Sequence, residues 1–273
     1  MRRRIASALV RITCALVLGL AARAEAKTIS ITIGQKAELR GESLVVKATV
    51  GNTGDESAKA VAANLRFGDK RARGKLHDDL APNANFEEEL TVPTGPLGEG
   101  RWPYEIAVDY ADANLYPFQA LLVTTTVVGN PPPAKLAVAE IASTGISDAG
   151  SLDLRLKNLA GVDRDVAYRV VVPEGLEASD ASGTVHLKGW GEATTSVGVT
   201  NRTALAGSRY PVFVAAEYDD GGVHQSIVAQ GMVEIVAARN FWEKNQTLLF
   251  AGAGLLVAVW LALVVRGAMG RTA

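Results

Sequence analysis

Residues that commonly carry enzyme chemistry are sparse in this 273-residue chain. A hydrolase nucleophile is most easily recognised in a Gly-x-Ser-x-Gly turn, and the sequence has none. The three histidines, His77, His186 and His224, lie singly, so no two of them share the short spacing of a zinc site. The single cysteine, Cys14, lies in an N-terminal segment that we expect to be removed. The sequence therefore predicts a protein that is not an enzyme and that uses no cofactor and no metal.

Carboxylates gather near the ends of two strand-like segments, at Asp109 and Asp112 and again at Glu217, Asp219 and Asp220. Clustered oxygen ligands can bind calcium in exported proteins, but this spacing does not match an EF-hand loop. Aspartate also forms tight turns for purely local reasons. We interpret both groups as turn residues and expect no calcium site.

A basic cluster is the clearest charged feature of the sequence. Its members fall within RFGDKRARGK and are Arg66, Lys70, Arg71, Arg73 and Lys75. On an exposed loop, such a cluster favours contact with an anionic polymer, a lipid headgroup or an acidic protein. Three aspartates flank it and dilute its field, so we favour a solvated hairpin tip and keep contact with an anionic partner as the alternative.

Two tryptophans offer flat aromatic surfaces of the kind that sugars stack on. Trp190 lies between two glycines, and we expect its side chain to be exposed. Trp102 lies on the apolar face of a strand-like segment, and we expect it in the core. Trp190 is therefore the candidate aromatic contact for a partner.

The segment that contains Trp102 occurs twice in the chain. Residues 101–112 read RWPYEIAVDYAD, and residues 209–220 read RYPVFVAAEYDD. Alternation with a period of two, as in both copies, is typical of a half-buried strand. The apolar face of the first copy consists of Trp102, Tyr104, Ile106, Val108 and Tyr110. We predict that the two copies occupy equivalent positions in two duplicated domains.

The proline-rich residues 130–133 separate two segments of similar length, residues 27–129 and 134–238. Each segment contains short strand-like runs between turn residues, at intervals of about 8 to 12 residues. This pattern predicts an all-β protein with two tandem immunoglobulin-like β-sandwiches, with a closed barrel as the alternative. Consecutive prolines are stiff, so we expect a limited range of angles between the domains.

The first domain has a recognisable order of short motifs. Asn-Thr-Gly-Asp at residues 52–55 follows one strand, Leu-Ala-Pro at residues 80–82 precedes another, and Gly100 precedes Tyr-Glu-Ile-Ala-Val-Asp at residues 104–109. This order resembles the bacterial cell-adhesion-related domain called CARDB, over residues 43–128. The resemblance implies an immunoglobulin-like fold and a periplasmic or cell-surface setting, and it implies no reaction.

The second domain departs from that order in two places. Residues 158–161 read Asn-Leu-Ala-Gly where the first domain has Asn-Thr-Gly-Asp. Residues 188–191 read Lys-Gly-Trp-Gly where the first domain has Leu-Ala-Pro. We interpret the second domain as a divergent copy of the first.

Both ends of the chain carry targeting signals. MRRR, an apolar run and Ala-Glu-Ala at residues 24–26 predict a signal peptide over residues 1–26. Residues 247–265 are uncharged and predict a transmembrane helix. Residues 239–246 are then juxtamembrane, and residues 266–273 form a cytoplasmic tail that contains two arginines.

These features predict a single-pass protein of the inner membrane whose two domains are periplasmic or extracellular. The exported part is acidic, which disfavours nucleic acid as a partner. The first hypothesis is a non-catalytic binding or scaffold protein with a protein partner. The alternatives are an accessory subunit of an envelope or transporter membrane complex, and a carbohydrate-binding or cell-wall-binding protein.

Overall fold

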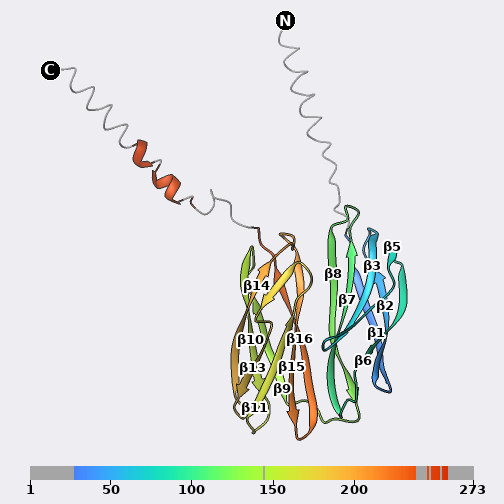
Figure 1. The fold of residues 1–273 in the computed structure, drawn as a ribbon. Coiled ribbons are helices and arrows are strands. Elements are labelled where there is room, and N and C mark those ends of the chain that lie inside the picture. The colour runs from blue at the N-terminus through green and yellow to red at the C-terminus, as the bar shows by residue number, and fades with distance from the viewer. Residues whose placement is uncertain (1–27, 144, 238–244, 246, 253, 258–273) are drawn as a thin grey trace, which may run out of the picture.

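The computed structural model describes residues 28–143, 145–237, 245, 247–252 and 254–257 (Figure 1). Within these residues, two antiparallel β-sandwiches lie side by side. The strands of the first domain are β1 (Ile31–Arg40), β2 (Ser43–Asn52), β3 (Ala58–Phe67), β4 (Lys70–Arg73), β5 (His77–Leu80), β6 (Asn85–Pro93), β7 (Gly100–Ala111) and β8 (Pro117–Val128). The strands of the second domain are β9 (Leu136–Ser143), β10 (Ala149–Asn158), β11 (Arg164–Val171), β12 (Leu176–Ser179), β13 (Ser182–Leu187), β14 (Glu192–Asn201), β15 (Arg209–Asp220) and β16 (Val223–Glu234).

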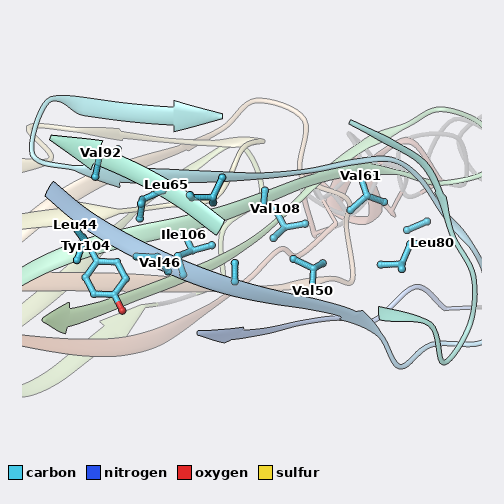
Figure 2. Close-up of a cluster of buried hydrophobic side chains, with 14 residues drawn as sticks. Leu44, Val46, Val50, Val61, Leu65, Leu80, Val92, Tyr104, Ile106 and Val108 are labelled. Atoms are coloured by element: carbon cyan, nitrogen blue, oxygen red, sulfur yellow. The ribbon is translucent and has the colours of Figure 1, made fainter. Parts of the chain in front are cut away.

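In the first domain, the sheet β1-β2-β6 packs against a second sheet in which β7 lies between β3 and β8. Successive side chains of a strand point to opposite faces, so alternate residues of each sheet meet in the core. The core side chains in Figure 2 include Leu44, Val46, Val50, Leu65, Ile106 and Val108. Tyr104 joins this core and donates its hydroxyl hydrogen to Gln35 Oε1 at 2.7 Å. Burial raises the pKa of Tyr104 to about 12.

In the second domain, the sheet β12-β14-β10-β9 packs against β13-β11-β15-β16. Its core is again built from alternate positions of facing strands and includes Leu152, Leu154, Val170, Val197, Val212 and Val214. In each domain two sheets pack face to face, so the predicted β-sandwiches are confirmed, and one bridge between His224 and Gly100 joins the second sheets of the two domains. The closed barrel is not formed.

The repeated segment forms β7 in the first domain and β15 in the second. β7 lies between β3 and β8, and β15 lies between β11 and β16. The prediction that the two copies occupy equivalent positions is confirmed. The expectation of half-burial is wrong for the middle of both strands, because Ala107 and Phe213 on their other faces are also buried. Those faces pack against each other across the domain boundary.

A buried asparagine organises the turn that follows β2. The Asn52 Nδ2 group donates to the carbonyl oxygens of Glu56 at 2.7 Å and Leu80 at 3.0 Å. Its Oδ1 atom accepts a hydrogen bond from the Gly54 amide at 3.0 Å. One side chain thereby connects the Asn-Thr-Gly-Asp turn to the Leu-Ala-Pro segment.

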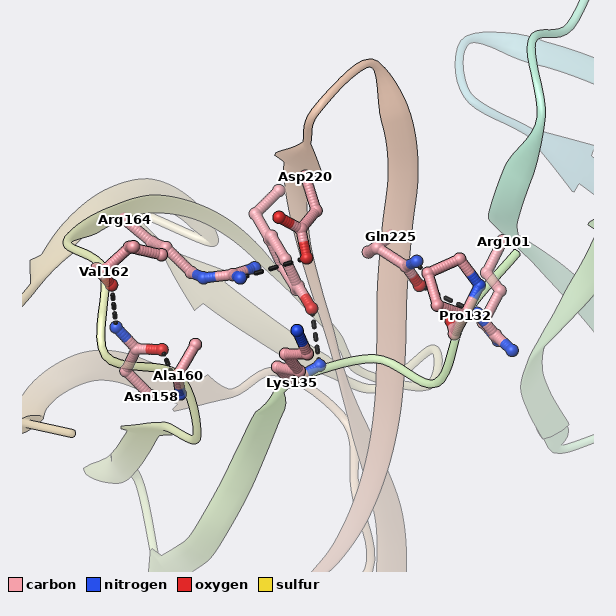
Figure 3. A network of polar contacts seen from close by, with 10 residues as sticks. Arg101, Pro132, Lys135, Asn158, Ala160, Val162, Arg164, Asp220 and Gln225 are labelled. Carbon is pink, nitrogen blue, oxygen red and sulfur yellow. Dashed lines mark hydrogen bonds and ion pairs between the residues drawn. The ribbon is translucent and has the colours of Figure 1, made fainter. Parts of the chain in front are cut away.

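The second domain repeats this arrangement with different neighbours (Figure 3). The Asn158 Nδ2 group donates to the carbonyl oxygens of Val162 at 2.7 Å and Lys188 at 3.0 Å. Its Oδ1 atom accepts from the Ala160 amide at 3.0 Å. Asn-Leu-Ala-Gly and Lys-Gly-Trp-Gly thus occupy the same structural positions as their counterparts in the first domain. The divergence between the copies lies in their side chains.

The predicted transmembrane segment is described only in part, and residues 247–252 and 254–257 are helical. Within the described part of the chain, no helix has the length and apolar character needed to cross a membrane. The predicted signal peptide, residues 239–244 and 246 of the juxtamembrane segment and the cytoplasmic tail lie outside the described residues.

Candidate binding groove between the two domains

Arg101, the first residue of the repeat, fixes the linker between the domains (Figure 3). Its Nη1 group donates to the Pro132 carbonyl oxygen at 2.5 Å and to Gln225 Oε1 at 2.8 Å. Its Nη2 group donates to the Pro131 carbonyl oxygen at 3.2 Å. Gln225 is fully buried and donates its own amide to the Pro132 carbonyl oxygen at 3.1 Å. A charged donor therefore satisfies carbonyl oxygens of the linker that prolines leave without a strand partner.

The backbones of the two domains also meet directly. The His224 amide donates to the Glu99 carbonyl oxygen at 3.1 Å, and the Ser226 hydroxyl donates to the Arg101 carbonyl oxygen at 2.9 Å. Gly100 lies between these contacts with a φ of 153°, and a Cβ atom there would be 2.2 Å from the His224 carbonyl oxygen. Only glycine allows this approach of the two chains. The contacts of Arg101 and Gly100 with the second domain are called the joint below.

Trp102 lies beside this joint and contacts the second domain, so the prediction that it lies in the core is wrong. Its ring stacks on the His224 ring with the centroids 3.9 Å apart and the planes at 14°. Its indole nitrogen donates to the Gly98 carbonyl oxygen at 3.1 Å. The alternation correctly assigns its face of the strand, but the sandwich core ends at Tyr104, before this position is reached.

Next to the joint, the outer faces of the two sheets form an interdomain contact. Its apolar part consists of Ala107, Leu121, Val123, Val171 and Phe213, with Val228 at the margin. Beside it, Glu105 Oε2 lies 3.8 Å from Arg66 Nη1 in its own domain and 3.7 Å from Arg169 Nη1 in the other. The Glu105 side chain is only 13% exposed, so its negative charge is largely shielded from water. The two arginines offset the cost of burying that charge.

Farther along, a groove opens between β8 and β16, which are the neighbouring strands of the two domains in Figure 1. Two hollows of about 340 and 450 Å³ share Leu122, Phe213 and Gln230 as lining residues. The hollow of about 450 Å³ is lined by Leu122, Val123, Thr124, Thr125, Phe213, Ser226, Ile227, Val228 and Gln230. Volumes of this size at a domain boundary are common for binding sites.

The groove ends in an aromatic section of about 480 Å³. This section shares four lining residues with the hollow of about 340 Å³, namely Tyr110, Phe118, Arg209 and Tyr210. The Tyr110 and Phe118 rings stack with centroids 5.6 Å apart. Burial raises the pKa of the Tyr110 hydroxyl, and the nearby Tyr210 raises it further by a smaller amount. Arg209 is exposed and carries no ion pair within the described residues, and Glu56 and Asp112 line the same section.

The structure divides the predicted basic cluster. Arg66, Arg71 and Arg73 line a separate hollow of about 350 Å³ on β3 and β4. Lys70 pairs with its neighbour Asp69 at 3.0 Å, and Lys75 does not line this hollow. Residues 70–73 pair with the end of β3, so the cluster lies on a β-hairpin, as the favoured interpretation expects.

Two carboxylates, Glu105 and Asp109, line the same hollow as the arginines. Asp109 accepts hydrogen bonds from Asn64 Nδ2 at 2.8 Å and from Gln119 Nε2 at 2.7 Å. Gln119 in turn accepts a hydrogen bond from the Glu174 amide of the second domain at 3.1 Å. These acids reduce the attraction of the hollow for an anion, and the network serves the interdomain contact.

Trp190 is 69% exposed, in agreement with its expected exposure. Leu159 and Val162, which are 40% and 58% exposed, lie in the adjoining turn. Trp190 has a φ of 60° and Asn83, at the same turn of the first domain, has a φ of 61°. Asparagine tolerates this left-handed conformation, whereas a bulky aromatic residue rarely adopts it. The second domain thus has an exposed tryptophan whose backbone conformation is unfavourable for a bulky side chain.

The remaining histidines have local partners. The His77 ring stacks on Phe86 with the centroids 3.8 Å apart, and His186 Nδ1 lies 2.8 Å from Asp165 Oδ1. In the described part of the chain, no three histidines, cysteines, aspartates or glutamates gather as a metal site would require.

The acidic groups are only partly turn residues. Asp112 forms the expected turn, because its Oδ1 atom accepts from the amides of Asn114 and Tyr116 at 2.8 and 2.9 Å. Asp220 instead pairs with Arg164 Nη2 at 3.0 Å, and that arginine is largely buried. Asp220 also flanks the tight turn at residues 221 and 222, because it pairs with Val223 across the β15–β16 hairpin.

The groove was not found from the sequence. Its walls come from the edges of two strands that are about 100 residues apart in the chain, and no local motif marks them. The one usable signal is the repeat, which aligns Arg209 with Arg101 and raises the question of what each arginine contacts.

No family model matches the chain, and no curated protein matches it. Among solved structures, red sea bream transglutaminase is 12% identical, covering 82% of this chain and 33% of its own, with a TM-score of 0.25. Alpha-2-macroglobulin of E. coli is 12% identical over 77% of this chain and 17% of its own, with a TM-score of 0.29. The YadV chaperone is 12% identical over 74% of this chain and 99% of its own, with a TM-score of 0.30. The chain spans a third or less of the first two proteins, and scores this low assign neither family nor function.

Proposed function

We propose that this chain is a non-catalytic binding or scaffold protein, anchored in the inner membrane, that presents two immunoglobulin-like domains on the far side from the cytoplasm. The observation that carries this proposal is the joint. Arg101, Gly100 and Gln225 fix two sandwiches side by side, and the fixed arrangement creates the groove between β8 and β16. A spacer without a partner would need no such groove.

The anchoring and the setting are supported by the sequence. The signal-peptide pattern of residues 1–26 and the apolar residues 247–265 favour a single span with a cytoplasmic tail. The motif order of residues 43–128 supports a CARDB-like first domain and a divergent second one. Two equivalent asparagine-centred turns are consistent with that duplication.

The proposal is tested by photo-crosslinking in intact cells. The full-length protein carries benzoylphenylalanine in place of Gln230 in the groove or, as a matched control, in place of Asp153 on the exposed face of β10. We expect a discrete protein adduct, identified by mass spectrometry, from position 230 and none from position 153. Equal labelling from both positions, or none from either, would contradict the proposal.

Carbohydrate binding is a second candidate function, and the exposure of Trp190 favours it. An exposed indole face offers a stacking surface without any change of fold. Retention of the protein on polysaccharide, abolished by Trp190→Ala, would support this function over the first. An accessory-subunit role is the remaining alternative, and stoichiometric co-purification with other membrane proteins in detergent would support it.

A further inference from the structure

One strand edge, that of β8, faces the groove without backbone partners. Within the described residues, β8 pairs only with β7, whereas the second edge of β16 is bonded at both ends, by His224 to the first domain and by the Glu234 carbonyl to the Ile146 amide. The groove touches consecutive residues of both strands, 122–125 and 226–228. Because alternate residues face opposite sides of a sheet, contact with consecutive residues means that the groove runs along the strand edges.

The joint shows which residues of β8 point their backbone groups into the groove. The Arg101 carbonyl accepts from Ser226, so it points away from β8. The amide and carbonyl of one strand residue point the same way, and the direction alternates along the strand. Trp102 and Tyr104 therefore bond to their partners on β8, whereas Pro103, like Arg101, turns its backbone groups away from β8 and leaves its partner Thr125 unbonded.

It follows that the odd-numbered residues of β8 from Gln119 to Val127 direct their N–H and C=O groups toward the groove. This row resembles the template that an incoming strand uses in β-strand addition. Thr125 is the clearest member of the row, because it lines the groove and, unlike Val123, is not buried.

Both faces of a strand added to β8 would find apolar side chains. Ile31 and Ile33 of β1 line the groove on the side of the first domain, and Phe213 lines it on the side of the second. A strand buried on both faces is typically a continuous apolar run. At the aromatic end, Arg209, which has no ion pair among the described residues, complements an acidic side chain.

We propose that the groove binds an extended segment of another protein, which adds a strand to the free edge of β8. The segment is apolar over about five residues and carries an aspartate or glutamate at the end that meets Arg209. This inference rests on the proposed function, because it names the chemistry of the partner that the groove takes.

The experiment uses the full-length protein in lipid nanodiscs and a library of random decapeptides displayed on phage. We expect enrichment of β-branched and aromatic runs with an acidic residue at one end. Enriched peptides are synthesised, and their dissociation constants are measured by fluorescence polarisation. Absence of enrichment, or enrichment of sequences without an apolar run, would overturn the proposal.

Three variants locate the contact on the edge. Thr125→Pro removes an N–H that faces the groove, and we expect binding to weaken at least about tenfold with little change in melting temperature. Thr125→Ala keeps the N–H and should bind within about twofold of the wild type. Thr124→Pro removes an N–H that bonds to β7, so its melting temperature should fall.

Unchanged peptide binding by folded Thr125→Pro would overturn strand addition. If benzoylphenylalanine at position 230 still crosslinked to a protein in cells, the proposed function would hold although strand addition had failed. A dimer of the wild-type protein that Thr125→Pro dissociates would likewise overturn the assignment of a foreign segment, because a second copy would then occupy the edge.

Discussion

The two domains use the same arginine for different purposes. Arg101 and Arg209 open the two copies of the repeated strand. Arg101 donates to the linker and to Gln225, whereas Arg209 lines the groove without an ion pair in the described part of the chain. The duplication supplied one side chain twice, and the joint needed only one. Under the proposed function, the second copy is the arginine that meets the partner.

A similar contrast separates the equivalent turns. Asn83 and Trp190 share a left-handed conformation, and the buried asparagines beneath them make the same three hydrogen bonds. The framework is therefore common to both domains, and the exposed side chains differ. Differences in function between the domains should arise from these side chains.

The largest effect is expected where the domains are most alike. Asn52→Ala and Asn158→Ala each leave two carbonyl oxygens and an amide, all buried or partly buried, without the side-chain partner. Each variant should lower the free energy of unfolding by about 2 to 3 kcal/mol, measured by urea denaturation. The exposed-turn variant Asn114→Ala should change it by less than about 0.5 kcal/mol. A loss in only one of the two domains would break the proposed equivalence.

The paired arginines sharpen the contrast between the domains. Arg101→Ala removes charge-assisted hydrogen bonds to the linker and should cost about 1.5 to 3 kcal/mol of stability. Arg209→Ala removes no ion pair and should cost less than about 0.5 kcal/mol. Both are compared by urea denaturation of the full-length protein. Equal losses would show that Arg209 has a structural role and would remove the contrast.

A smaller effect, of opposite sign, is expected at the left-handed turns. Trp190→Asn installs the residue that the first domain uses and should stabilise the protein by about 1 kcal/mol. The reverse change, Asn83→Trp, should destabilise it by a similar amount. Calorimetric melting temperatures report both shifts. A destabilised Trp190→Asn would mean that the indole contributes packing despite its exposure.

At neutral pH, the smallest effect concerns Tyr104, whose position in the second domain is taken by Val212. Burial raises the pKa of Tyr104 to about 12, so the folded protein holds this proton more tightly than the unfolded chain does. Its contribution to stability is complete below pH 10 and is lost as the pH rises toward 12. Tyr104→Phe should flatten the alkaline fall of the unfolding free energy. An unchanged fall would assign it to other groups.

Much of the fold could be predicted because it depends on local pattern. Alternation in residues 101–112 and 209–220 identified the two equivalent strands, and a linker of three prolines separated the domains. Trp102 was misplaced because alternation gives the face of a strand but not where the core ends. The groove could not be predicted, because it depends on how β8 and β16 approach after the joint has formed.

The central claim is that the joint fixes the two domains in one arrangement. Pulsed electron paramagnetic resonance between nitroxides at Lys47→Cys on β2 and Asp153→Cys on β10, in a Cys14→Ser background, measures their separation directly. The account predicts one narrow distance distribution for the wild-type joint and a broader one after Arg101→Ala. A broad distribution with the joint intact would contradict it.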